Sequence, residues 1–144
     1  MAFREKLAWA LLATTAGGYA IYCYLLAGVT GRNGWDGPVW SIVPPLIGMG
    51  VLMALLATIG AGGAAISAPR DATAPPDERD RLVARTAQAH AYWVLTSGIG
   101  VTVALMLAGI SLFQITNLLV SILVIAEIVR YASEAWHYRR GWHG

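Results

Sequence analysis

Four long runs of apolar residues, each almost free of charge, dominate this sequence. They lie roughly at 7–29, 39–67, 91–110 and 112–126. The hydrocarbon core of a bilayer is about 30 Å thick, and a helix needs about 20 apolar residues to cross it. Only 12% of the 144 residues are charged, about half the share of a soluble domain. The sequence therefore predicts four transmembrane helices.

The predicted fold class is therefore all-α. We expect a polytopic membrane protein whose helices form one bundle, and a single domain over 1–144. The predicted helices cover about 5–29, 38–67, 77–110 and 112–138, and a proline-bearing linker is predicted at 68–76.

Prolines and acidic residues refine two of these helices. Pro44 and Pro45 fall inside the second predicted helix, where the missing N–H groups predict a kink or a wide turn. Asp77 follows the linker and Asp80 comes three residues later, which is typical of an N-cap with an acidic first turn.

Basic residues predict the orientation in the membrane. They gather at both ends of the chain and in the middle connection, as Arg4, Lys6, Arg70, Arg79, Arg81, Arg85, Arg130, Arg139 and Arg140. The first connection has Arg32 alone and the third has none. Because positively charged loops stay on the cytoplasmic side, both termini are predicted to be cytoplasmic.

A polar stripe interrupts the last apolar run. Its members recur every three or four residues and share one helical face: Glu127, Arg130, Tyr131, Glu134, His137 and Tyr138. A carboxylate inside a membrane is costly and usually pairs, so Arg130 is the expected partner of Glu127. Proton or cation handling by Glu127, a ligand pocket and a partner contact are the alternatives.

Two histidines are predicted to lie at similar depth near the inner ends of the last two helices. A short loop makes these helices neighbours, so His90 and His137 can approach one another. They are either interfacial residues with a polar tip or ligands of a haem or a metal, the latter with Glu134 at i, i+3 spacing. The sequence has no phosphate loop, nucleophile elbow, H-E-x-x-H or C-x-x-C motif. No cofactor, no metal and no enzymatic activity are predicted.

Exposed arginines are the predicted contacts for lipid or partner. Those before the third helix and after the fourth are the candidates, namely Arg79, Arg81, Arg85, Arg139 and Arg140. They suit anionic lipid headgroups or an acidic partner. The net charge of +2 is too small and too spread for nucleic-acid binding.

Small residues predict close helix packing. Gly60 with Ala64 and Ala13 with Gly17 are four residues apart, and a third group is SGIG at 97–100. Such residues let helix backbones approach in a membrane. They predict packing within the chain or an interface between copies in an oligomer.

The second half of the chain resembles a known group of proteins. The segments DERDRLVARTAQAHAYWVL, SGIGVTVALMLAG and VRYASEAWHYRRG are similar to those of uncharacterised four-helix bacterial inner-membrane proteins. That group shows a D-E-R motif before helix 3 and a Y-R-R-G-like end after helix 4. The resemblance implies a multi-pass protein of the bacterial inner membrane and a regulatory or stress-linked role. It supplies no catalytic residues.

The sequence is compatible with three functions. The first is a non-enzymatic accessory, scaffold or regulatory subunit, acting through a cytoplasmic face formed by 77–85 and the tail from Glu134, in a homo-oligomer or larger complex. The second is a small oligomeric transporter or channel, with Glu127 and Arg130 in its inner half. Its outer half would use Gln114, Thr116 and Asn117. The third is a haem- or quinone-binding redox subunit that uses His90 and His137.

Overall fold

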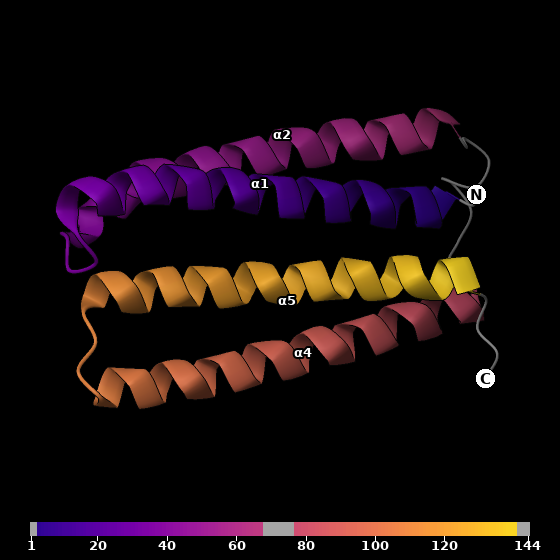
Figure 1. The fold of residues 1–144 in the computed structure, drawn as a ribbon. Coiled ribbons are helices and arrows are strands. Elements are labelled where there is room, and N and C mark those ends of the chain that lie inside the picture. The colour runs from indigo at the N-terminus through magenta and orange to yellow at the C-terminus, as the bar shows by residue number, and fades with distance from the viewer. Residues whose placement is uncertain (1–2, 68–76, 141–144) are drawn as a thin grey trace.

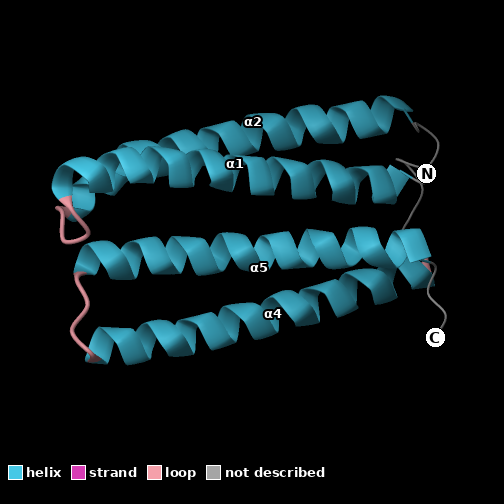
Figure 2. Cartoon of the chain, in the orientation of Figure 1, coloured by secondary structure: helices cyan, strands magenta, loops and turns pink. Residues whose placement is uncertain are grey.

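The computed structural model describes residues 3–67 and 77–140, and Figure 1 shows them as long helices that run side by side. The helices are α1 (Phe3–Asn33), the 3-10 helix η1 (Val39–Ile42), α2 (Val43–Ser67), α4 (Glu78–Leu107) and α5 (Leu112–Arg140). The described residues contain no strand (Figure 2). Four helical segments are long and apolar enough to cross a membrane, which confirms the predicted fold class. The predicted linker at 68–76 lies outside the described residues.

Two helical hairpins make up the fold. α1 packs against α2, α4 packs against α5, and α1 packs against α5, so the helices follow the order α2–α1–α5–α4. Within the described residues, the backbone of α2 reaches neither α4 nor α5. We call the end that carries residues 34–42 and 108–111 the loop end, and the opposite end, where α1 and α4 begin, the terminal end (Figure 1).

The apolar core lies on both sides of the α1–α5 contact. Its buried residues are Tyr22, Val29, Ile42, Met49, Phe113 and Val124, which come from every helical element except α4. α4 is the least buried span and α5 the most, with 6% and 28% of their apolar segments buried. α4 is therefore a peripheral helix that depends on α5 for its place.

The prolines of the second span lie at its start. α2 begins at Val43, so Pro44 and Pro45 occupy its first turn and not its interior. The first N–H groups of a helix have no acceptor within it, which is why proline is tolerated there. The helical span begins at Val39, directly after its N-cap Pro38, as predicted. The interior kink is replaced by a change of helix type: the 3-10 helix η1 ends at Ile42, and the two prolines lie where α2 begins.

Glycines in left-handed conformations end two of the helices. Gly34 follows α1 with φ of 73°, and Gly109 follows α4 with φ of 86°. A residue with a side chain rarely adopts these angles. α1 thus continues to Asn33, beyond the predicted end at 29, and α4 stops at Leu107, short of the predicted end at 110.

Some of the small residues lie at helix contacts within the chain. A Cβ atom placed on Gly98 of α4 would lie 2.5 Å from Cγ2 of Ile122 in α5. One placed on Gly60 of α2 would lie 3.1 Å from Cβ of Ala10 in α1. The predicted packing within the chain is therefore confirmed at Gly60 and Gly98. A Cβ atom on Gly17 or Gly100 would meet nothing within 4 Å.

We expect Gly98→Ala to destabilise the protein although alanine favours helix formation by about 1 kcal/mol over glycine. The added methyl group must displace Ile122, and overpacking of this kind costs about 1–3 kcal/mol. Gly100→Ala is the matched control, because it has the same helix and the same gain in propensity without the clash. Thermal unfolding in detergent measures both. A melting temperature of Gly98→Ala equal to that of Gly100→Ala would show that α4 and α5 do not approach here.

Candidate functional site at the terminal end

Asp80 links three helices at the terminal end. Its Oδ2 atom lies 2.7 Å from Nε of Arg4 in α1, and its Oδ1 atom accepts a hydrogen bond of 3.1 Å from the hydroxyl of Tyr138 in α5. Asp80 also completes the helix cap. Asp77 Oδ1 accepts from the Asp80 N–H at 2.7 Å, and Asp80 Oδ2 accepts from the Asp77 N–H at 3.2 Å. The predicted N-cap at Asp77 is confirmed. The ion pair with Arg4 was not predicted.

One arginine serves two carboxylates on α5. Nη1 of Arg130 lies 3.2 Å from Oε2 of Glu127, as the sequence predicts. Nε of the same guanidinium lies 3.6 Å from Oε1 of Glu134. Nη2 donates a hydrogen bond of 3.4 Å to the hydroxyl of Tyr131. Each of the three guanidinium nitrogens of Arg130 therefore has a partner on its own helix.

The two histidines meet across α4 and α5, as expected, and Ser133 joins them. His90 Nδ1 lies 2.9 Å from the Ser133 hydroxyl, and His137 Nδ1 lies 3.4 Å from it. His137 Nδ1 is also 2.7 Å from the Ser133 carbonyl oxygen. Since a carbonyl only accepts, a hydrogen bond here requires the tautomer with its proton on Nδ1. The rings stack with their centroids 6.4 Å apart.

The histidine pair offers a metal or a haem one nitrogen of each ring. A ligand atom would have to be Nε2 of each histidine, since both Nδ1 atoms are engaged with Ser133. Glu134 is engaged with Arg130. No three histidine, cysteine or acidic side chains gather as a metal site among residues 3–67 and 77–140.

Polar residues at the loop end serve the fold. The hydroxyl of Tyr22 donates a buried hydrogen bond of 2.6 Å to Oδ1 of Asn117, which joins α1 to α5. Asn117 Nδ2 donates to the Phe113 carbonyl at 2.8 Å. Gln114 Oε1 accepts from the Ser111 N–H at 3.2 Å, and Thr116 donates to a carbonyl one turn back. The residues predicted for the outer half of a transport path thus bond within the chain.

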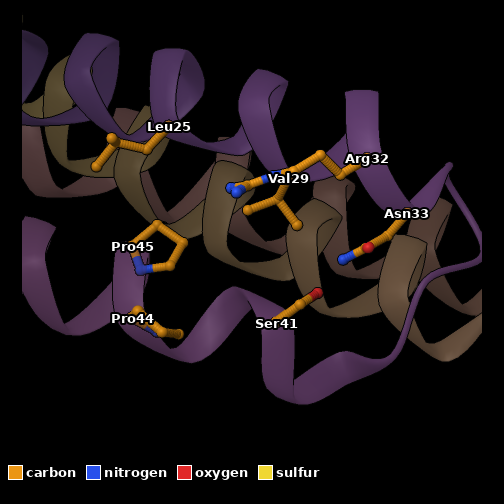
Figure 3. Close-up of a pocket in the computed structure, with 7 residues that line it drawn as sticks. All are labelled: Leu25, Val29, Arg32, Asn33, Ser41, Pro44 and Pro45. Carbon is orange, nitrogen blue, oxygen red and sulfur yellow. The ribbon is translucent and has the colours of Figure 1, made fainter.

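Pockets lie between the helices of the described residues, and three of them bear on the predicted sites. One pocket, of about 510 Å³, lies at the loop end between α1 and the start of α2. Figure 3 shows the residues that line it, Leu25, Val29, Arg32, Asn33, Ser41, Pro44 and Pro45. Arg32 is its charged residue, and Arg32 Nε donates to the Gly28 carbonyl at 3.0 Å. A second, of about 430 Å³, lies between α1 and α5 and includes Gln114 and Asn117.

The third pocket brings Glu127 and Arg130 of α5 to an apolar surface. It has a volume of about 450 Å³ and is lined by Leu11, Thr14, Thr15, Met49, Met53, Ala54, Ala57, Leu123, Val124, Glu127, Arg130 and Tyr131. We call it the α1–α2–α5 groove. Gln114 in the second pocket and Glu127 in this groove are about 140° apart around α5. The two polar regions therefore open on different sides of the helix.

Exposed arginines mark the outside of the terminal end. Arg79, Arg81, Arg85 and Arg139 are all exposed, and none forms an ion pair with another described residue. The side chain of Arg140 lies outside the described part of the chain. The first turns of α4 thus direct Asp80 inward and their arginines outward.

Replacing Asp80 by alanine removes the contacts to Arg4 and Tyr138 and half of the helix cap. We expect a loss of about 1–3 kcal/mol in unfolding free energy, since partly buried bonds to a charged group are stronger than exposed ones. Glu78→Ala removes a neighbouring acid from the same helical turn, where it is exposed, and serves as the control. Thermal unfolding followed by circular dichroism compares the two. Equal melting temperatures would contradict a linking role for Asp80.

A comparison with protein families completes the description of this chain. The family model described as "Predicted membrane protein (DUF2178)" matches residues 9–142. The match includes the first two helices, which the resemblance noted in the sequence did not cover. No curated protein and no solved structure shows significant similarity to the chain. The chain belongs to DUF2178, an uncharacterised family of predicted membrane proteins.

Proposed function

We propose that this protein is a non-enzymatic subunit of the bacterial inner membrane, with an accessory, scaffold or regulatory role. It assembles with an acidic partner protein through the terminal end. This end faces the cytoplasm, because the basic residues of the chain gather there. The contact surface consists of the exposed arginines Arg79, Arg81 and Arg85 on α4 together with Arg139 at the end of α5.

The separation of charge on α4 is the observation that carries this proposal. Asp80 lies among the arginines in sequence, yet it pairs with Arg4 of another helix. Arg79 and Arg81, its neighbours, are exposed and form no ion pair with a described residue. Asp80 is thus used inside the fold, and the exposed acids of this segment, Asp77 and Glu78, are fewer than its three exposed arginines. This leaves a positive surface for acidic groups of a partner, which would be steered to it over a distance of about 8–10 Å at physiological salt.

The shallow burial of α4 supports assembly within the membrane as well. α4 packs against α5 and leaves most of its length uncovered, with 6% of its apolar segment buried. Residues such as Ser97 and Gly100 are exposed on it, and small residues favour close helix contacts in lipid. A homo-oligomer or a larger complex would cover this surface.

Transport and redox functions receive less support from the geometry. A transport path needs polar groups along one side of the protein, whereas Asn117 and Glu127 line different pockets. A haem needs a cavity beside its histidines, whereas neither His90 nor His137 lines any of the three pockets described above.

Reversal of three charges tests the proposed contact. In the variant Arg79→Glu, Arg81→Glu, Arg85→Glu, the surface becomes acidic, and we expect partner proteins to be lost from the complex purified in mild detergent. Native mass spectrometry identifies the polypeptides that remain. The control is Arg32→Glu, since Arg32 is also exposed but lies at the loop end.

Two results would contradict the proposal. Unchanged partners in the triple variant would remove the arginine surface from the contact. Purification of the wild-type protein with anionic phospholipid as its sole companion would show that these arginines are lipid anchors.

Labelling of introduced cysteines tests the orientation. Cys23 is the only cysteine, so a Cys23→Ser background lacks thiols. We expect Asp36→Cys at the loop end to react with a membrane-impermeant maleimide in intact cells. Arg139→Cys should react only after the membrane is permeabilised. The reverse pattern would place the terminal end outside.

A further inference from the structure

The loop-end pocket between α1 and the start of α2 has an apolar part and a polar part. Leu25, Val29 and the two prolines of α2 supply apolar surface, whereas Arg32, Asn33 and Ser41 supply polar groups. Its volume of about 510 Å³ is within the range of pockets that bind small molecules, about 300–1,000 Å³. The pocket therefore combines a positive charge with a surface suited to hydrocarbon.

Arg32 has unused donors in this pocket. Its Nε atom donates to the Gly28 carbonyl at 3.0 Å, which holds the guanidinium against α1. Its Nη1 and Nη2 atoms form no hydrogen bond and no ion pair with a described residue. Figure 3 shows the side chain extending past Val29 toward the apolar part of the pocket. The two Nη groups are thus available to a ligand there.

No acid of the described chain neutralises Arg32. Asp36 is the only acidic residue between positions 6 and 70. It is exposed, does not line the pocket and forms no ion pair with Arg32. In the α1–α2–α5 groove, by contrast, Arg130 has Glu127 beside it. The loop-end pocket is therefore the one of these two sites whose charge is complementary to an anion.

Exposed tryptophans indicate that this pocket lies at a membrane surface. Trp35 lies in the turn after α1, and Trp40 lies in η1, next to Ser41 of the pocket. Both side chains are exposed. Tryptophan is enriched where lipid headgroups meet hydrocarbon. An anion that carries hydrocarbon and lies at this level is the phosphate group of a membrane lipid.

From these observations we infer that the loop-end pocket binds one phospholipid of the adjacent leaflet. The Nη groups of Arg32 donate to two phosphate oxygens, a bidentate geometry that suits a guanidinium. The side-chain amide of Asn33 lines the pocket without a hydrogen bond to another described residue, and donates to the headgroup. One acyl chain lies on Leu25, Val29 and the prolines. This site is independent of the proposed partner contact, which lies at the other end of the molecule.

Both parts of the pocket contribute to this choice of ligand. A cation would be repelled by Arg32. A small soluble phosphate would leave Leu25 and Val29 uncovered, and an uncharged lipid would leave the Nη groups without acceptors. Because Nε already bonds to Gly28, the guanidinium is oriented before the ligand arrives, which lowers the entropy that binding costs.

Two lipids with the same acyl chains test this inference. Phosphatidylglycerol carries the phosphate, and diacylglycerol lacks it. Each is added to the full chain, purified in mild detergent and freed of lipid, and native mass spectrometry counts the molecules retained. We expect one phosphatidylglycerol and no diacylglycerol. Equal retention of both lipids, or of neither, would overturn the proposal. Displacement by soluble glycerol phosphate at the same concentration would also overturn it, since the site would then bind a soluble phosphate.

Variants locate the site. Arg32→Gln removes the charge but keeps a polar side chain, and we expect phosphatidylglycerol to bind at least about tenfold more weakly, because bonds between charged groups are lost. Arg32→Lys keeps the charge and should bind more tightly than Arg32→Gln. Leu25→Trp fills the apolar part of the pocket from α1, where Leu25 is an exposed lining residue. It should abolish binding without any change of charge.

Arg85→Gln is the matched control, since it removes an exposed arginine at the terminal end and should leave the retained lipid in place. Loss of the lipid from Arg85→Gln together with its retention by Arg32→Gln and Leu25→Trp would place it at the terminal end and overturn the site. Helical circular dichroism shows whether each variant is folded. Failure of these tests would leave the proposed partner contact through Arg79, Arg81 and Arg85 untouched, because Arg32 is not part of it.

Discussion

The seam between α1 and α5 holds the two helical hairpins together. Within the described residues it is the main backbone contact between them, supplemented by η1 at the loop end. Lipid is as apolar as the side chains, so helices in a membrane gain little from burying apolar surface and depend on packing and hydrogen bonds. The seam has both. Phe113 and Val124 pack in its core, and Tyr22 donates its buried hydrogen bond to Asn117.

The position of the seam also decides where ligands and partners can reach the protein. Because α1 and α5 are central, one groove remains on each of two sides of α5, and Glu127 and Arg130 of its polar stripe line one of them. α4 is left at the edge of the fold, attached to α5 and linked to α1 by the side chains of Asp80 and Arg4. An edge helix with little burial is the natural place for contact with another subunit.

Much of the fold follows from local features of the sequence. The number of spans follows from apolar runs, the cap at Asp77 from its acidic first turn, and the pairing of Glu127 with Arg130 from their spacing on one helix. The position of Pro44 and Pro45 in the first turn of α2 could not be predicted in the same way. Proline is compatible with the first turn of a helix and with a kink in its interior, and the sequence does not show at which residue α2 begins.

Contacts between helices were harder to predict than contacts within them. Spacing shows which residues share a face, but it does not show which helix that face meets. The meeting of His90 with His137 could be predicted because a short loop makes α4 and α5 neighbours, whereas the bridging by Ser133 could not. Asp80 and Arg4 are distant in sequence, and their pairing depends on α1 lying next to α5.

The charged residues of α4 and α5 are satisfied in different ways. Glu127 and Glu134 share Arg130 within α5, and Asp80 of α4 pairs with Arg4 of α1. Arg79, Arg81, Arg85 and Arg139 are exposed and form no ion pair with another described residue, so water or an acidic partner satisfies their charge. The proposed contact through these arginines can therefore form without breaking the ion pairs that hold the fold, since the two sets use different side chains.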